Sequence, residues 1–293
     1  MSLSPLRVVQ LSDLHISSSP GGYEWRDTSQ SFEAVTEHVM GTPPDMIVVT
    51  GDITDGGRPD EYELAGNALA ALGVPVYCLP GNHDSVDSLH AHLPRPGVVV
   101  QATMRVGAWQ FLFADSNAGG TDFDAEHGWI DTPDRIHEAK GGLTDHEFSW
   151  LERQLSASSA EHTMLWLHHP PGSVTYFEQP SYDEQICRLV EGSESLRAVA
   201  AGHAHTGITA EIGGIPSHLC PSTGLSIDFE AMTVMPPGYR TYSFWPDGRI
   251  DTSVVWIDDA RWNERHRLPP VLAEYLAGRT GFDEVQTWLD SVG

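Results

Sequence analysis

Short apolar runs alternate along this chain with segments in which apolar residues recur at helical spacing. Apolar runs of roughly four to eight residues are typical of strands buried on both faces of a parallel sheet. Five runs fit this pattern, at residues 6–11, 46–50, 74–79, 164–167 and 196–201. A sixth run, at 109–114, is also strand-like.

Four segments between these runs predict amphipathic helices, at residues 28–40, 59–72, 144–155 and 182–190. The second begins with Pro59 and is followed by Gly73, residues that are typical of a helix start and a helix end. Thr144 and Glu147 have the spacing of a capping box at the start of the third. Because strands and helices alternate, the sequence predicts a layered α/β fold.

Two regions depart from the alternation. Residues 116–142 are rich in Gly, Asp and His without a clear period, which indicates an insertion loop near a site or a solvated acidic excursion. Near the end, strand-like runs at 239–245 and 250–257 flank a turn and predict a hairpin, followed by short helices at 270–277 and 281–291. We therefore expect a main domain over residues 1–230 and a C-terminal segment over 231–293 that caps a site or contacts a second copy.

The chain is strongly acidic. It has 293 residues with 41 acidic and 16 basic side chains, a net charge of −25. Such a field repels the phosphates of nucleic acids and anionic membranes, so we expect neither as a partner. A small anionic substrate stays compatible with this charge, because a bound metal ion can reverse the local sign.

Cysteine usage and the N-terminal residues bear on the cellular compartment. The three cysteines, Cys78, Cys187 and Cys220, are far apart and form no metal-binding spacing, which favours free thiols in a reducing compartment. The first residues lack the layout of a signal peptide, and no run of about 18 apolar residues occurs. We therefore expect a cytoplasmic protein.

Each of the five apolar runs ends on residues that can bind a metal. The sequences that follow them are SDLH at 12–15, GD at 51–52, GNHD at 81–84, HHPP at 168–171 and GHAH at 202–205. Ligands of α/β proteins bind just beyond the carboxyl ends of the strands. We therefore expect five separate segments to direct Asp, Asn and His side chains toward one edge of the sheet.

The spacing within these segments suits metal binding. Residues i and i+2 of an extended chain share a face, so Asp13 and His15 can point at one ion, and so can His203 and His205. The two oxygens of Asp52 can bridge two ions. Taken alone, each segment has a structural explanation: an Asp can cap a helix, and a His can lie in the core or on the surface. The occurrence of all five at strand ends favours a metal site.

The order D-x-H, G-D, G-N-H-D, H-x-P and G-H-x-H resembles the calcineurin-like metallophosphoesterase superfamily. The HHPP stretch, together with PPGYR at 236–240 and PDG at 246–248, is similar to its bacterial class III branch, which contains cyclic-nucleotide and glycerophosphodiester phosphodiesterases. The resemblance implies a β-sandwich flanked by helices, with a dinuclear metal site at the C-terminal ends of the strands.

The resemblance also implies a ligand set. One ion would be held by Asp13, His15, Asp52 and His205, and the other by Asp52, Asn82, His168 and His203. His168 is preferred because Pro170 follows it at the family's H-x-P spacing, and His169 remains the alternative. His83 would contact the substrate phosphate together with Asn82 and His205. Asp84 would either orient His83 or cap the next helix.

The activity that the resemblance implies is hydrolysis of a small phosphodiester by in-line attack of a hydroxide that bridges two ions, with Asp52 and His83 as catalytic residues. Mixed His, Asp and Asn ligands favour Mn, Fe, Zn or Co over Ca or Mg. A phosphomonoesterase or nucleotide pyrophosphatase could use the same site, and a scaffold with an inactive site is a further alternative. The family also suggests a homo-oligomer such as a dimer.

Overall fold

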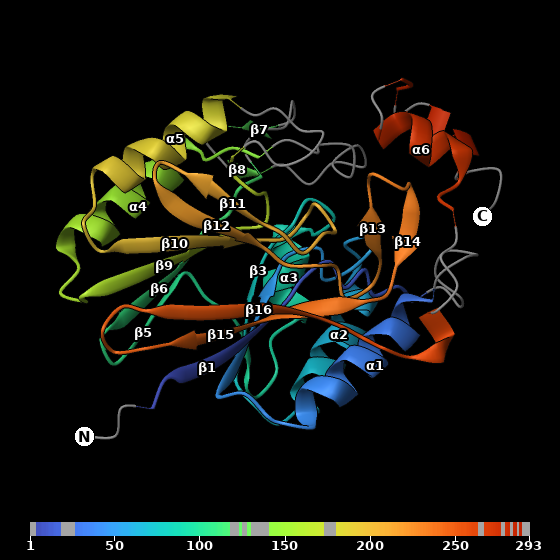
Figure 1. Cartoon of the computed structure of the whole chain (residues 1–293), viewed down its shortest axis with the longest axis horizontal. Helices are drawn as coiled ribbons and strands as arrows, with labels where there is room; N and C mark the ends of the chain where they lie inside the picture. The colour runs from blue at the N-terminus through green and yellow to red at the C-terminus, as the bar shows by residue number, and fades with distance from the viewer. Residues whose placement is uncertain are drawn as a thin grey trace.

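Two six-stranded mixed sheets form the framework of the computed structural model (Figure 1). It describes residues 4–18, 27–117, 123–124, 128–129, 141–172, 180–262, 267–276, 279–281, 284–285 and 287–288. The strand order of the first sheet is β16 (Ile250–Trp256), β15 (Gly238–Phe244), β1 (Leu6–Leu11), β2 (Met46–Thr50), β3 (Val76–Leu79), β4 (Val98–Val100). That of the second is β11 (Thr209–Ile212), β12 (Ile215–Leu219), β10 (Leu196–Ala201), β9 (His162–Trp166), β6 (Trp109–Phe113), β5 (Thr103–Val106).

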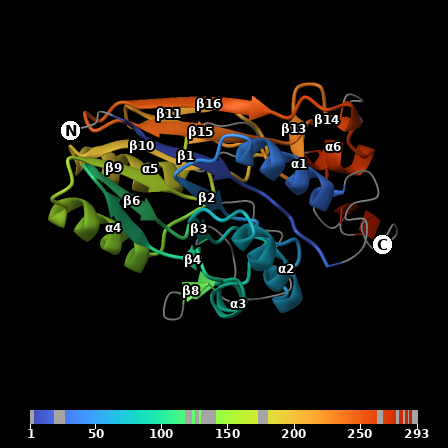
Figure 2. The same cartoon turned by 90° about the horizontal axis from the view of Figure 1, so that it is seen from below.

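Helices cover the outer faces of the two sheets. Helices α1 (Thr28–Met40), α2 (Pro59–Ala70) and α3 (Val86–His92) pack on the first sheet, and α4 (Asp145–Ala157) and α5 (Pro180–Glu191) pack on the second. Figure 1 shows α4 and α5 at the upper left and α1 and α2 at the lower right, and Figure 2 shows the same layers from below. Between the sheets lies an aromatic-rich core that includes Phe111, Trp166, Tyr242 and Phe244. The expected layered α/β sandwich is confirmed.

Alternation along the strands explains this layering. In β1, Val8 faces the core between the sheets, whereas Val9 and Leu11 face the helices. Strands buried on both faces therefore read as continuous apolar runs, and the runs at 6–11, 46–50 and 196–201 have the same bounds in the structure. Helix 28–40 also has its predicted bounds.

The expectation of one sheet edge is wrong, because the five strands divide between two sheets. Strands β1, β2 and β3 belong to the first sheet, and β9 and β10 belong to the second. Parallel pairing inside each sheet still brings their carboxyl ends to the same side of the molecule.

The capping box expected at the start of α4 is only half present. Thr144 accepts from the Glu147 N–H, but the Glu147 carboxylate accepts instead from the backbone N–H of Asp115.

The C-terminal hairpin is part of the first sheet. Strand β15 pairs antiparallel with β1 and with β16, so residues 238–256 extend the sheet beyond its N-terminal strand. Two smaller hairpins are β13 (Ser226–Asp228) with β14 (Thr233–Met235), and β7 (Phe123–Asp124) with β8 (Gly128–Trp129). Helix α6 (Pro270–Leu276) lies beside β13 and β14 (Figures 1 and 2).

Some expectations concern residues that are not described. Most of the insertion at 116–142 and most of the helix expected at 281–291 lie outside the described residues. Within the described part of the chain, no helix has the length and apolar character needed to cross a membrane.

Candidate metal centre

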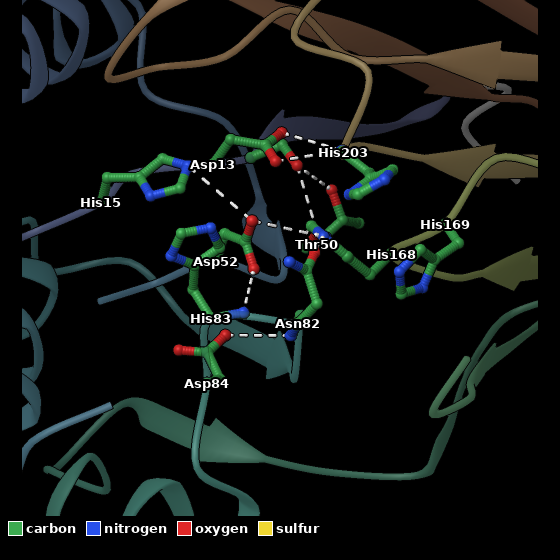
Figure 3. A network of polar contacts seen from close by, with 12 residues as sticks. Asp13, His15, Thr50, Asp52, Asn82, His83, Asp84, His168, His169 and His203 are labelled. Carbon is green, nitrogen blue, oxygen red and sulfur yellow. Dashed lines mark hydrogen bonds and ion pairs between the residues drawn. The ribbon is translucent and has the colours of Figure 1, made fainter. Parts of the chain in front are cut away.

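Ligand-type side chains from both sheets converge where the strands end (Figure 3). One group has four ligand atoms within 4.8 Å of one another, and its members are Asp13, His15, Asp52 and His205. A second group, with the same spacing, consists of His168, His169 and His203. The structure thus brings together all the residues that the sequence predicts as ligands, with Asn82 beside His168.

The backbone is strained at these residues. Six non-glycine residues in the described chain have positive φ, and five of them are Asp13, His15, Asp52, His203 and His205. Asp and His tolerate the left-handed region better than most residues, but each such residue still costs about 1–3 kcal/mol. Strain of this kind concentrates where the position of a side chain matters for function.

Three glycines allow the segments to approach each other. A Cβ added to Gly81 would lie 2.2 Å from Asp52 Oδ1, and one added to Gly202 would lie 1.8 Å from Ser12 Oγ. A Cβ on Gly51, which has φ +84°, would lie 2.5 Å from His168 Nδ1. The absence of a side chain at these three positions therefore permits the close contact between the loops.

Backbone carbonyls fix the orientation of two imidazoles. His168 Nδ1 donates to the carbonyl of Thr50 (2.8 Å), and His205 Nδ1 donates to the carbonyl of Leu225 (2.5 Å). A carbonyl can only accept, so Nδ1 carries the proton and Nε2 faces the site. His168 Nε2 lies 3.0 Å from Asn82 Oδ1, and His205 Nε2 lies 3.5 Å from Asp13 Oδ1.

His15 is held by a carboxylate that the sequence reasoning did not single out. Its Nδ1 lies 3.2 Å from Asp55 Oδ1, and its Nε2 lies 3.3 Å from His205 Nε2 and 3.7 Å from Asp52 Oδ2. A carboxylate that binds the outer nitrogen of a histidine is a common support for metal ligands. The signal in the sequence is weak: Asp55 lies three residues after Asp52 in a loop.

Asp52 belongs to the first group and lies beside the second. Its Oδ2 is 3.4 Å from His168 Nε2, and its Oδ1 accepts the backbone N–H of His83 at 2.9 Å. Burial disfavours its charge, but the surrounding imidazoles outweigh this effect and hold its pKa well below the usual value. The carboxylate therefore stays ionised, and its Oδ2 lies near both His15 Nε2 (3.7 Å) and His168 Nε2 (3.4 Å).

The pKa values of the histidines diverge. Burial disfavours the charged forms of His15 and His168, yet neighbouring carboxylates prevail and raise both pKa values to about 9. Burial and nearby positive imidazoles lower the pKa of His203 and of His205 to about 3. Burial also raises the pKa of Asp13. The buried carboxylates thus require compensating positive charge.

His83 lies at the open side of this cluster. Its side chain is 18% exposed, its Nδ1 donates to the carbonyl of Asp55 (2.9 Å), and its ring meets that of His15 edge-on at 4.6 Å. These contacts leave Nε2 as the nitrogen that can reach a substrate.

Asp84 serves neither of the roles considered for it. Within the described chain its buried carboxylate accepts from the N–H groups of Gly81, Ile53 and Thr54 and from the Tyr62 hydroxyl. Ser85, not Asp84, caps α3. Asp84 therefore ties the loop after β2 to the loop after β3, because a carboxylate can accept from several donors at once.

His168 and His169 differ in their contacts. The Nε2 of His168 faces Asn82 and Asp52, whereas Nδ1 of His169 lies 3.0 Å from Ser116 Oγ. The rings of His169 and His203 are 4.5 Å apart, so His169 also belongs to the second group.

The donor set suits divalent transition metals. Among the described residues, no Lys or Arg side chain pairs with Asp13 or Asp52, and the converging atoms are carboxylate oxygens, an amide oxygen and imidazole nitrogens. Buried carboxylates are stable when they are paired or bound to metal. Metal ions fit this cluster and would supply positive charge in place of the protons on His15 and His168.

Comparison with known proteins agrees with this geometry. The model of the calcineurin-like phosphoesterase family matches residues 6–207, which include every residue of the cluster. The chain belongs to the calcineurin-like phosphoesterase family. Members of this family use a dinuclear divalent metal site, and the two ligand groups described above are its candidates here.

Relatives of this calcineurin-like phosphoesterase match over most of their length. The 3',5'-cyclic adenosine monophosphate phosphodiesterase CpdA of Vibrio vulnificus is 28% identical, over 87% of this chain and 91% of its own length. The probable glycerophosphodiester phosphodiesterase GpdQ of Arcobacter nitrofigilis is 29% identical, over 82% of this chain and 89% of its own length. A dimetal phosphatase from Danio rerio has the same fold, with a TM-score of 0.60 at 14% identity, over 87% of this chain and all of its own.

Proposed function

We propose that this protein is a metal-dependent phosphodiesterase that hydrolyses a small diester, of the cyclic-nucleotide or glycerophosphodiester type. The observation that carries the proposal is the position of Asp52, which belongs to one group of ligand-type side chains and lies beside His168 of the other. The similarity to phosphodiesterases such as CpdA and GpdQ supports the diester substrate. The net charge of −25 favours a small substrate over a nucleic acid.

Seven residues would hold two divalent ions, chosen from Mn, Fe, Zn and Co. Asp13, His15, Asp52 and His205 would bind one ion, and Asp52, Asn82, His168 and His203 the other. When bound, such a pair acidifies a water molecule and neutralises charge that develops on the phosphate. The chain keeps the Nε2 atoms of His168 and His205 directed inward through the carbonyls of Thr50 and Leu225.

His83 would act on the substrate itself. Anchoring of its Nδ1 on the Asp55 carbonyl leaves Nε2 directed away from the backbone, where it can donate a proton or a hydrogen bond to the leaving oxygen. Asn82 and His205 would lie beside the phosphate. Since the backbone N–H of His83 also binds Asp52, the substrate-facing histidine and the central carboxylate are held in one arrangement.

The test compares bis(p-nitrophenyl) phosphate with p-nitrophenyl phosphate after metal removal and addition of Mn²⁺. We expect faster turnover of the diester, followed by turnover of a cyclic nucleotide or a glycerophosphodiester. Asp52→Asn should abolish turnover of both p-nitrophenyl substrates. Asp87→Asn makes the same change at an exposed position of α3 and should leave turnover of both at the wild-type level. Preference for the monoester would replace the proposal with a phosphomonoesterase, and no turnover with any metal would indicate an inactive scaffold.

A further inference from the structure

Each proposed ion would depend on both sheets. The first ligand set takes Asp13, His15 and Asp52 from the ends of β1 and β2, but His205 from the end of β10. The second set joins Asp52 and Asn82 of the first sheet to His168 and His203 of the second. The relative position of the two sheets therefore determines the geometry of both proposed metal sites.

One buried amide bridges the sheets just beneath this cluster. Gln10, in β1, is fully buried and faces the space between the sheets. Its Nε2 donates to Thr50 Oγ1 at the end of β2 (2.8 Å) and to the carbonyl of Ala201 at the end of β10 (3.0 Å). Because the Ala201 carbonyl can only accept, the amide nitrogen must face it, and Oε1 is left to accept from the Tyr242 hydroxyl (2.7 Å).

The bridge leads directly to the proposed ligands. Thr50 lies two residues before Asp52, and its own carbonyl holds Nδ1 of His168. Its hydroxyl donates to Ser12 Oγ (2.9 Å), and Ser12 precedes Asp13. On the other sheet, Ala201 lies two residues before His203. The amide of Gln10 thus connects the chain segments that deliver ligands from both sheets.

We infer that Gln10 is a positioning residue of the metal centre, supported by Tyr242 of the C-terminal hairpin. Its amide aligns the carboxyl ends of β2 and β10 and so keeps the two halves of the ligand set at a fixed separation. The inference rests on the proposed function for the identity of the ligand sets. It also gives the hairpin β15–β16 a part in the site, although it supplies none of the proposed ligands.

A matched control is available in the second sheet. Gln110, in β6, is also a buried strand amide, but its partners are Thr103, Gln154 and Ser158 on β5 and around α4. Gln10→Leu and Gln110→Leu each remove one buried amide and the hydrogen bonds that it makes, so both variants should lose thermal stability. Only Gln10→Leu should disturb the metal centre.

The experiment measures Mn²⁺ binding to the metal-stripped full-length protein by competition with a fluorescent chelator, alongside melting temperature. We expect Gln10→Leu to weaken binding of both ions about 10–100-fold, as is usual when a support of metal ligands is lost. With the diester as substrate its kcat should fall while KM changes little. Gln110→Leu should keep both affinities within about twofold of wild type, the scatter expected for independent sites.

A Gln10→Leu protein with a lowered melting temperature but wild-type Mn²⁺ affinity would overturn the inference. If Gln10→Leu does not fold, Tyr242→Phe, which removes a single hydroxyl, decides the question: weaker binding of both ions supports the inference, and unchanged binding overturns it. A wild-type protein that binds two Mn²⁺ ions without hydrolysing diesters would overturn the proposed function alone.

Discussion

Replacing Gly81 with Ala should displace the central carboxylate of the site. The added Cβ would lie 2.2 Å from Asp52 Oδ1, 2.3 Å from Asp52 N and 2.9 Å from Asp52 Cγ. Since non-bonded carbon contacts are favourable only near 3.5 Å, the loops after β2 and β3 must separate by about 1 Å. The Asp52 carboxylate would then lose its bond to the His83 N–H.

The magnitude follows from this displacement. Overpacking of this kind costs about 1–3 kcal/mol of stability. A misplacement of about 1 Å lowers a rate about 100-fold. We therefore expect the kcat for bis(p-nitrophenyl) phosphate to fall about 100-fold in the Mn²⁺-loaded variant, a larger effect than the stability loss alone explains.

The assay combines kcat with the melting temperature and uses Gly41→Ala as its control. Gly41 ends α1 with an ordinary φ of −59°, is exposed, and a Cβ there would lie 3.2 Å from the carbonyl of His38. We expect wild-type kcat from this control. Wild-type kcat in Gly81→Ala would refute the argument that close contact of the two loops positions Asp52.

Three further predictions concern individual histidines. His83→Ala should lower kcat about 100- to 10,000-fold, as loss of a general acid does, while elemental analysis finds unchanged metal content; lost metal would instead make His83 a ligand. His168→Ala should bind one ion fewer than wild type, and His169→Ala should bind the same number as wild type. The opposite result would make His169, and not His168, the ligand. Finally, His15 and His168, with pKa values of about 9, carry protons that a metal must displace. Mn²⁺ affinity of the metal-free protein should therefore rise as pH increases from about 6.5 toward 9, by up to tenfold per unit for each displaced proton; constant affinity across this range would contradict the assignment of these two residues as ligands.

The sequence predicts the bounds of three central strands. The strand at 46–50 is buried throughout, and those at 6–11 and 196–201 are buried toward their carboxyl ends, so these apolar runs end where the strands end. The third strand begins at Val76 rather than at residue 74, because Pro75 has no N–H to donate to the ladder.

Pairing between distant strands was not predictable in the same way. Leu6 pairs with Phe244, and no local pattern specifies this partner, so the presence of two sheets could not be read from the runs. The sequence does not indicate the β11–β12 hairpin, although Gly213 and Gly214 mark its turn, since its short strands mix polar and apolar residues.

The proposed ligands could be found because Asp, Asn and His follow strand ends in the sequence. The groups that orient them could not, since two of these are the backbone carbonyls of Thr50 and Leu225, which every residue type possesses. Asp84 is the opposite case, since it lies inside a functional motif but its carboxylate joins two loops.

Phosphodiester hydrolysis by this protein should depend on two divalent ions held by residues of both sheets. The most direct measurement adds Mn²⁺ stepwise to the metal-stripped protein and records both bound Mn²⁺ per chain and turnover of bis(p-nitrophenyl) phosphate. We expect no turnover without metal and a plateau when two ions are bound. Full turnover by the stripped protein, or a plateau at one bound ion, would contradict this dependence.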